Sequence, residues 1–303
     1  MKKILKNVYV VKEYQLGDLD CCVYLVDTKS DDGLVLIDAG LYLSKIKEIE
    51  KYGFELKDIK HCLITHSHID HFGACHELKK INTNIKFYAH KLDINKIEQK
   101  EKEEYIQQYY ADYKYEPVKV TNIIKEDGVI LKFGQLEFKC IHIPGHTPGS
   151  LAYLLETEQK RILFGGDLPG LAIVLEGSNL DDYVKSMPKL YDLKIDILCE
   201  GHEKIIQPAE KVLKFIKGYV KFNQYLHIIV KVNPLDSKVM LDLIKLSCEL
   251  EFYENALDFC NYLIEIDPNN KEGHYLLNEI EKHKPAKYEF IKGFIKANYR
   301  NNI

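Results

Sequence analysis

The chain has 303 residues, of which 46% are hydrophobic and 29% are charged, and its formal net charge at pH 7 is −4. This balance is typical of a soluble globular protein and argues against a disordered or membrane-embedded chain. A slightly acidic chain offers no general attraction for nucleic acid or for an anionic lipid surface. The length favours one main domain with a smaller appendage.

The amino-terminal segment and the cysteines both bear on where the protein works. Polar residues interrupt the first stretch before the apolar core of a signal peptide can form, and no segment reaches the length of a membrane span. The eight cysteines form no C-x-x-C pair. We therefore expect reduced thiols in a cytoplasmic protein, most of them packed as small apolar residues. The adjacent Cys21 and Cys22 leave a redox site as an alternative.

The first part of the chain is predicted to be rich in β-structure. Apolar runs and alternations that contain β-branched and aromatic residues predict strands, and apolar residues at helical spacing predict helices between them. The predicted strands are residues 7–14, 20–28, 33–40, 61–65 and 85–90, and the predicted helices are residues 43–52 and 70–81.

The second part predicts another group of strands after a polar excursion. Residues 92–115 are charged and rich in tyrosine, so we expect a helical segment over the mouth of a site, where Tyr105, Tyr109, Tyr110, Tyr113 and Tyr115 either line the opening or pack a surface helix. Strands are predicted at residues 128–134, 136–144, 150–156, 161–167 and 196–202, with a helix at residues 181–193. Strands and helices in both halves predict two packed sheets flanked by helices.

Beyond about residue 205 the pattern is helical and contains a repeat. Residues 222–238 resemble residues 255–271, and Pro234 and Pro268 are 34 residues apart, which is the tetratricopeptide period. Phe222 replaces the small residue expected in the earlier copy, and Ser247 stands where an aromatic residue is usual. A plain helical tail with two similar proline-terminated helices is the alternative.

The segment THSHIDH, residues 65–71, follows a short apolar run. His66 and His68 are two apart at the end of a predicted strand, so an extended backbone points both rings to the same side. Asp70 and His71 lie in the turn where the next predicted helix begins. Four imidazole and carboxylate donors so close together suit a borderline divalent metal, with zinc as the first choice and iron or manganese as alternatives.

Three further candidate ligands, His146, Asp167 and His202, each stand beside a glycine at the end of a predicted strand. Glycine lets the backbone approach a metal closely, because it has no Cβ to clash. Each residue alone is uninformative, but their order after H-x-H-x-D-H is specific. His90 and His142 adjoin predicted strands near these residues and are candidates for supporting the ligands.

Together with Asp38 in the segment LIDAG, these residues resemble the metallo-β-lactamase superfamily of hydrolases over about residues 3–217. The resemblance implies an α+β protein, a four-layer αβ/βα sandwich with metals at one edge between the sheets, followed here by a small all-α domain. His68 takes the place of the glutamate of the flavodiiron branch, which argues against reduction of oxygen or nitric oxide. Glu203 departs from the small residue that often follows the last histidine.

The resemblance also implies two divalent metal ions and a role for each motif residue. Asp167 would bridge the two ions, and Asp38 would orient ligands through hydrogen bonds. The first ion would be held by His66, His68 and His146, and the second by Asp70, His71 and His202.

Two ions that share a hydroxide lower its pKa to near neutrality, so the implied reaction is hydrolysis without a side-chain nucleophile. The sequence accordingly has no G-x-S-x-G motif. Asp70 is the candidate for proton transfer. The ligand set is shared with the hydroxyacylglutathione hydrolase and lactonase-like branch, so we expect a small ester, thioester or lactone as substrate, with a phosphodiester as an alternative.

Two classes of function stay open. The filled ligand set favours a hydrolase domain over residues 1–217, and the 34-residue period favours a tetratricopeptide-like domain over residues 218–303 that binds a peptide or forms a homodimer. In the second class the protein is a partner-binding or regulatory protein. Membrane partners are not expected, and the charge argues against nucleic acid.

Overall fold

The computed structural model describes residues 1–13, 15, 19–99, 113–157, 159–168, 177–285, 291–293 and 295. The chain divides into two compact units, one formed by residues 1–179 and 194–212 and the other by residues 180–193 and 213–303. The division into a hydrolase domain of residues 1–217 and a helical domain of residues 218–303 stays a prediction. Each unit is described separately below.

The first unit contains a seven-stranded sheet in the order β1-β2-β3-β4-β5-β6-β7. Its first four strands pair antiparallel, and β4, β5, β6 and β7 pair parallel. The strands are β1 (Lys2–Leu5), β2 (Val8–Lys12), β3 (Val23–Asp27), β4 (Leu34–Ile37), β5 (Ile59–Leu63), β6 (Lys86–His90) and β7 (Asn122–Ile124). Sequence patterns did not predict β1 and β7, which are short strands at the two edges of the sheet.

The second sheet has five strands in the order β12-β11-β10-β9-β8. Its pairs are antiparallel except for β11 and β12, which run parallel. The strands are β8 (Ile130–Phe133), β9 (Leu136–His142), β10 (Leu151–Glu156), β11 (Arg161–Gly166) and β12 (Ile197–Glu200). All five fall within segments that the sequence predicted as strands.

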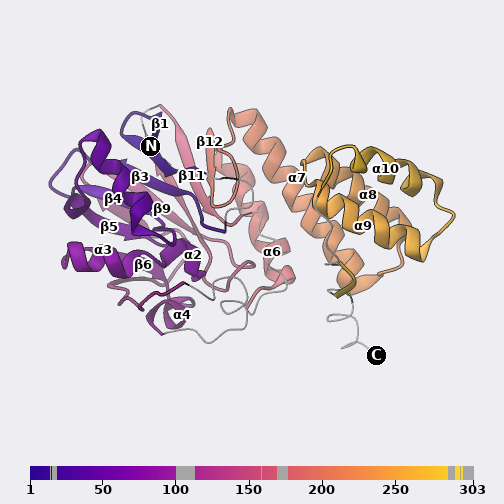
Figure 1. Cartoon of the computed structure of the whole chain (residues 1–303), viewed down its shortest axis with the longest axis horizontal. Coiled ribbons are helices and arrows are strands. Elements are labelled where there is room, and N and C mark those ends of the chain that lie inside the picture. The colour runs from indigo at the N-terminus through magenta and orange to yellow at the C-terminus, as the bar shows by residue number, and fades with distance from the viewer. Residues whose placement is uncertain are drawn as a thin grey trace. The chain divides into compact units, whose positions relative to one another are not determined.

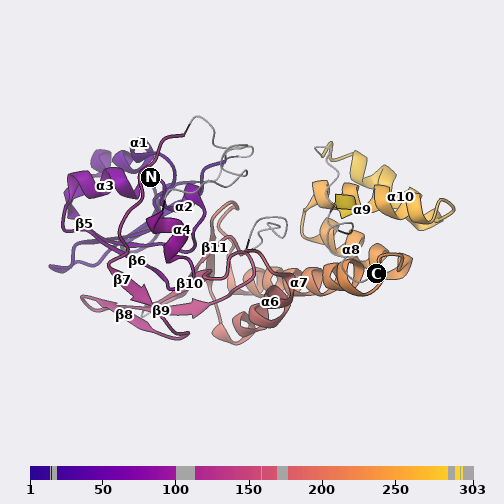
Figure 2. The ribbon, with the colours of Figure 1, turned by 90° about the horizontal axis from the view of Figure 1, so that it is seen from below.

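Both faces of the first sheet are buried. Successive side chains of a strand point to opposite faces, so neighbouring residues of one strand join different apolar clusters. On β3, Leu25 belongs to an apolar cluster that includes Ile46 of α1 (Leu43–Ile46) and Leu78 of α3 (Cys75–Ile81). Its neighbour Tyr24 belongs to a second cluster with strands of the other sheet and lies 5.4 Å from the ring of Phe164. Figure 2 shows α1 and α3 on one side of the first sheet and β8 and β9 on the other.

The helices of the first unit are short. They are α1 (Leu43–Ile46), η1 (Lys47–Tyr52), η2 (Leu56–Asp58), α2 (Ile69–Phe72), α3 (Cys75–Ile81) and α4 (Ile94–Glu98), where η1 and η2 are 3-10 helices. The prediction of one helix over residues 70–81 is wrong, because the chain breaks between α2 and α3. Ala74 donates its N–H to the carbonyl of Gly40, and the carbonyl of His71 accepts from Ala39, so a neighbouring loop takes the hydrogen bonds of a continuous helix.

All the regular elements that the structure describes in the second unit are helices. Figure 1 shows α8, α9 and α10 side by side. The elements are α6 (Leu180–Ser186), the 3-10 helix η4 (Met187–Leu193), α7 (Ala209–His227, whose last residues from 213 belong here), the π-helical η5 (Ile228–Val232), α8 (Ser237–Glu249), α9 (Tyr253–Ile266) and α10 (Lys271–Glu281). Phe222 of α7 lies at the centre of its core, with ring centroids 6.0 Å from both Phe252 and Phe259.

Two helices of this unit begin in the same way. Asp236 caps α8 by accepting from the N–H of Val239, and Asn270 caps α10 by accepting from the N–H of Gly273. These caps are 34 residues apart, the same interval as the two prolines. The tetratricopeptide assignment stays a prediction, which this recurrence supports.

Candidate metal centre

The segment of residues 65–71 follows β5, and its start lies against the second sheet. Tyr153 of β10 donates its hydroxyl to the carbonyl of Ile64 at 2.8 Å, and the N–H of Leu151 donates to the carbonyl of Thr65 at 2.8 Å. These bonds hold the start of the segment against the opposite sheet. His68 then has an extended backbone, with φ −74° and ψ 140°, before α2 begins.

The first donor group consists of His66, His68 and His146, and it joins loops that are far apart in sequence. Nε2 of His66 lies 3.0 Å from Nδ1 of His68 and 3.1 Å from Nε2 of His146. Nδ1 of His68 and Nε2 of His146 are 2.8 Å apart. A neutral imidazole has one N–H, so protons cannot pair all three nitrogens, whereas one divalent cation accepts a lone pair from each.

The second donor group consists of Asp70, His71 and His202. Oδ2 of Asp70 lies 2.9 Å from Nε2 of His202 and 3.5 Å from Nε2 of His71. Asp70 and His71 come from the first turn of α2, and His202 follows β12. The structure therefore brings together the second set of residues that the sequence resemblance grouped.

Asp167 lies between the two donor groups. Its Oδ2 is 3.3 Å from Nε2 of His146 and 3.5 Å from Nε2 of His202, and its Oδ1 is 3.0 Å from Nε2 of His71. One carboxylate thus faces histidines of both groups, with a separate oxygen turned toward His71. This is the placement that a ligand shared by two ions requires.

The donor atoms fit divalent metal ions by their burial as well as by their type. Nε2 of His71 and Oδ1 of Asp167 are buried and lie 3.0 Å apart, but neither makes a hydrogen bond. Unpaired buried polar atoms are costly unless another group satisfies them, and a metal ion would do so here. Within the described residues, both donor groups are sets of close ligand atoms suited to a metal ion.

The protonation of His66 and Asp167 also favours cation binding. Burial, together with the neighbouring imidazoles of His71 and His146, holds the pKa of His66 well below its ordinary value. Burial alone raises the pKa of Asp167, but the imidazoles of His202 and His71 outweigh it and hold that pKa well below the usual range. The neutral ring and the ionised carboxylate are the forms that bind metals.

His71 differs from His66 in this respect. Burial lowers the pKa of its ring, but Cys21 and the carboxylates of Asp167, Asp38 and Asp70 outweigh burial and raise that pKa well above its ordinary value. A metal ion would therefore have to displace a proton from His71.

Asp38 supports the centre from the turn after β4. Its backbone has a left-handed φ of 56°, a conformation that non-glycine residues adopt rarely. Oδ1 accepts from the N–H of Thr65 at 2.8 Å, and Oδ2 lies 2.9 Å from the hydroxyl of Thr65 and 2.8 Å from Nδ1 of His71. Asp38 therefore lies beside His71, one of the candidate ligands, and its role in orienting the ligands stays a prediction.

Sequence reasoning missed two residues that hold the ligands. The hydroxyl of Thr65 lies 3.0 Å from Nδ1 of His66, so it connects Asp38 to the first donor group. The buried carboxylate of Asp93 bonds to groups in both loops of that donor group. Because threonine and aspartate are common outside metal sites, neither residue alone gave a signal in the sequence.

Other residues near the centre have different roles. The rings of His90 and His142 stack on each other 4.0 Å apart, and Nε2 of His142 lies 2.9 Å from the carbonyl of Pro148, in the loop that follows His146. Cys21, Asp38 and His71 also place possible ligand atoms within 4.8 Å of one another. All eight cysteines are free of disulfides.

The tyrosine-rich excursion is described only in part, because residues 100–112 lie outside the described residues, and Tyr105, Tyr109 and Tyr110 with them. Tyr115 is buried in the apolar cluster between the first sheet and its helices, and Tyr113 packs against that cluster. The structure therefore shows that Tyr113 and Tyr115 pack against the apolar cluster and do not line an opening.

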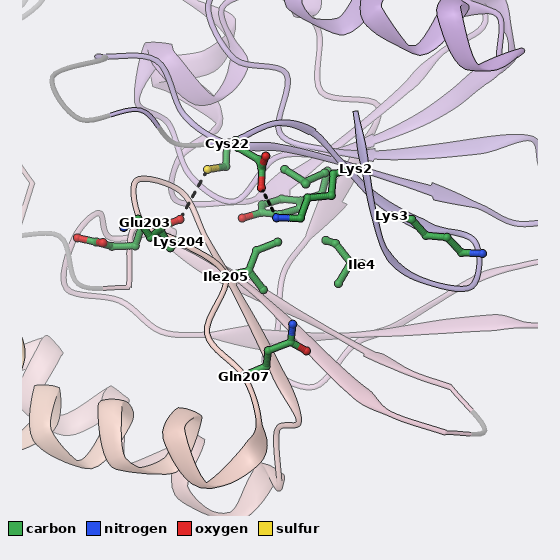
Figure 3. A pocket seen from close by; sticks show the side chains of 11 residues that line it. Lys2, Lys3, Ile4, Cys22, Glu203, Lys204, Ile205 and Gln207 are labelled. Atoms are coloured by element: carbon green, nitrogen blue, oxygen red, sulfur yellow. Dashed lines mark hydrogen bonds and ion pairs between the residues drawn. The ribbon is translucent and has the colours of Figure 1, made fainter.

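A cavity of about 480 Å³ lies beside the segment that follows His202 (Figure 3). Its lining includes Cys22, whose thiol lies 3.8 Å from the carbonyl of Glu203, and Lys2, which pairs with Glu13 at 2.9 Å. No member of either donor group, and neither Asp38 nor Asp167, lines this cavity. It is therefore separate from the metal centre.

Comparison with known proteins agrees with the geometry. Residues 16–202 match the family model of the metallo-beta-lactamase superfamily. The chain is 34% identical over 218 residues to an uncharacterized protein of Aquifex aeolicus, covering 69% of this chain and 97% of that protein. It is 28% identical to a hydroxyacylglutathione hydrolase of Buchnera aphidicola, covering 56% of this chain but only 57% of that enzyme.

A solved structure extends this likeness to three dimensions. The class B3 di-zinc metallo-beta-lactamase LRA-12 from an Alaskan soil metagenome matches with a TM-score of 0.54 and 28% identity, over 66% of this chain and 77% of that one. The expected fold class is thereby confirmed, as a metallo-β-lactamase sandwich followed by an all-helical region. Among the helices that the structure describes, none is long and apolar enough to cross a membrane.

Proposed function

Because this chain belongs to the metallo-beta-lactamase superfamily, we propose that it hydrolyses a small ester, thioester or lactone with two divalent metal ions. Membership makes the chain a metal-dependent hydrolase, as its motifs predicted. The observation that carries the proposal is the position of Asp167, which contacts histidines of two separate donor groups. Zinc is the first choice for both ions, with iron or manganese as alternatives, because the donors are imidazole and carboxylate.

The chain offers seven ligand side chains, more than one tetrahedral ion can use. When bound, two such ions would supply Lewis acidity and a nucleophilic water at neutral pH. In the proposed arrangement both ions would share Asp167 as a ligand. The first ion would be held by His66, His68 and His146, and the second by Asp70, His71 and His202.

We assign proton transfer to Asp70. Burial alone raises the pKa of its carboxyl group, but the imidazoles of His71 and His202 outweigh burial and lower that pKa below its usual value. Asp70 is therefore ionised at neutral pH and able to accept a proton. Its Oδ2 lies 2.9 Å from Nε2 of His202, so the same contact holds the oxygen in place.

The acyl group and the leaving group are proposed at the level of a class. The chain spans little more than half the length of the hydroxyacylglutathione hydrolase that it matches, so a thioester substrate is a proposal and not a transfer of that enzyme's activity. A phosphodiester is the alternative within the same superfamily. We propose that the helical unit forms a homodimer contact or binds a peptide partner. In the alternative function class, that of a partner-binding or regulatory protein, it would regulate the site.

The test is elemental analysis of metal-replete protein, combined with turnover on a panel of thioesters, lactones, aryl esters and phosphodiesters. We expect close to two ions per chain and turnover of an acyl substrate that is lost on chelation and restored by metal. One ion or fewer per chain would contradict the two-ion proposal. Turnover confined to phosphodiesters would replace the acyl substrate class.

A further inference from the structure

Asp93 occupies a helix-capping position without capping its helix. It precedes α4, with φ −103° and ψ −5°, yet its side chain accepts no hydrogen bond from that helix. An aspartate at this position usually accepts from the first free N–H groups, which stabilises a helix by about 1 kcal/mol. The carboxylate of Asp93 is only 1% exposed and is used elsewhere.

The carboxylate instead bonds to both loops of the first donor group. Oδ2 accepts from the N–H of Ser67 at 2.9 Å and from the hydroxyl of Thr147 at 2.7 Å, and Oδ1 accepts from the N–H of Gly149 at 2.8 Å. Ser67 stands between His66 and His68 in the sequence, and Thr147 follows His146 directly. One side chain therefore ties together the two loops whose ring nitrogens converge.

The hydrogen bonds around Asp93 form a directed network. An ionised carboxylate can only accept, so the hydroxyl of Thr147 donates to Asp93 and accepts from the hydroxyl of Ser150, which lies 2.9 Å away. The hydroxyl oxygen of Ser150 in turn accepts from the N–H of Thr147 at 3.0 Å. Gly149 packs so closely that a Cβ there would lie 2.5 Å from Cγ of Asp93. The network thus fixes the loop of His146 against Asp93.

We propose that Asp93 is a positioning residue that holds the loops of His66, His68 and His146 at the separation one metal ion requires. The three ring nitrogens lie within 2.8 to 3.1 Å of one another, and without a cation protons cannot pair all three, so at least one close contact between them is unfavourable. Hydrogen bonds to an ionised group are about twice as strong as neutral ones. The buried bonds to Asp93 therefore keep the two loops from moving apart. The inference rests on the proposed function, because it assumes that these histidines bind metal.

The first test compares metal affinity in Asp93→Asn and in the wild-type full-length protein, by competition with a chromophoric chelator and by the cobalt(II) absorption spectrum. Asparagine replaces one carboxylate oxygen with an NH2 group, which can only donate. In the place of Oδ2 this group would face the N–H of Ser67 and the hydroxyl of Thr147, which are also donors. We expect about 10- to 100-fold weaker binding of one ion and an altered cobalt spectrum. Asp196→Asn is the matched control, because Asp196 accepts from the N–H of Arg161 without contact to the ligand loops, and its affinity should not change.

A second pair of variants keeps the inference testable if Asp93→Asn does not fold. Thr147→Val removes the hydroxyl that donates to Asp93, whereas Thr147→Ser keeps it, so the first should weaken metal binding and the second should restore it. Wild-type affinity in Thr147→Val, or in a folded Asp93→Asn, even with a lowered Tm, would overturn the inference alone. A wild-type protein that binds no metal would overturn the proposed function and the inference with it.

Discussion

Nδ1 of His71 and Oδ2 of Asp38 lie 2.8 Å apart, although 33 residues separate them in the sequence. A carboxylate accepts at this distance, so Nδ1 donates its proton to Asp38, and a metal ion that displaced the proton of Nε2 would bind the lone pair left there. Nε2 faces Asp70 and Asp167. The turn after β4 thus selects the tautomer of a proposed metal ligand on α2.

Asp38→Ala should therefore lower turnover without abolishing it. The ring of His71 would lose the partner that fixes its tautomer, and losses of roughly 10- to 100-fold are typical of such changes. The measurement is kcat/KM on a substrate identified from the panel, with Asp196→Ala as the control carboxylate. Full activity in Asp38→Ala would show that the second donor group does not depend on this hydrogen bond.

His68→Ala and Asp167→Ala should each abolish turnover while the far-ultraviolet circular dichroism spectrum stays close to that of the wild type. Both residues lie on loops at the edge of the sheets and contribute nothing to the apolar clusters. His274→Ala is the control, because His274 bonds to the carbonyl of Pro268 in the helical unit. Near-wild-type rates in either ligand variant would mean that the donor groups are not the catalytic centre.

Gly166→Ala should destabilise the protein and reduce metal binding. Gly166 has φ +59°, and a Cβ there would lie 2.7 Å from the hydroxyl oxygen of Thr65, which touches both Asp38 and His66. Forcing extra volume into such a packed place costs about 1–3 kcal/mol. Chemical denaturation and chelator competition measure the two effects.

Gly53→Ala is the matched control for this variant. Gly53 has φ +84°, but a Cβ there would meet no atom within 4 Å. Both substitutions strain the backbone, so the difference between them isolates the contact with Thr65. Equal effects of the two variants on metal affinity would remove Thr65 from the account of the centre.

His61→Gln should reduce the decrease in the free energy of unfolding that occurs as the pH falls. Burial lowers the pKa of His61 from 6.5 to about 4, and its ring centroid lies 4.3 Å from that of Phe133. Between these values the unfolded chain binds a proton that the folded protein does not, so the free energy of unfolding falls as the pH falls from 6.5 to about 4. Above pH 6.5 this contribution is fully present.

The measurement is denaturant unfolding at several pH values from 7 to 4. The wild type should lose more stability over this range than His61→Gln does. Identical profiles for wild type and His61→Gln would refute the prediction.

Phe222→Ala should destabilise the helical unit by about 3–5 kcal/mol, the usual cost of removing a buried phenylalanine ring. Phe222 is fully buried between Phe252 and Phe259, in the place where the tetratricopeptide pattern expects a small residue. Phe215→Ala is the control, since Phe215 is only half-buried. If the two variants unfolded at the same denaturant concentration, Phe222 would not be the centre of this core.

The sequence predicted the central strands and the donor residues because both depend on local patterns. Alternating apolar residues on β3 follow from its burial on both faces, and the spacing of His66 and His68 follows from an extended backbone. Edge strands such as β1 and β7 have weaker patterns, because less of their surface is buried. The helix over residues 70–81 was predicted as one piece because its spacing is helical throughout.

By itself, the sequence determined which residues can bind metal, through the chemistry of imidazole and carboxylate and through their order along the chain. Only the tertiary structure decided how they are held, because hydrogen bonds join residues far apart in sequence. The bond from Ala74 to Gly40 breaks the predicted helix and leaves Asp70 and His71 in a separate turn. Asp93 reaches Thr147 across 54 residues, and no local pattern encodes such a contact. The donors are thus local in their chemistry, whereas their convergence depends on packing between distant segments.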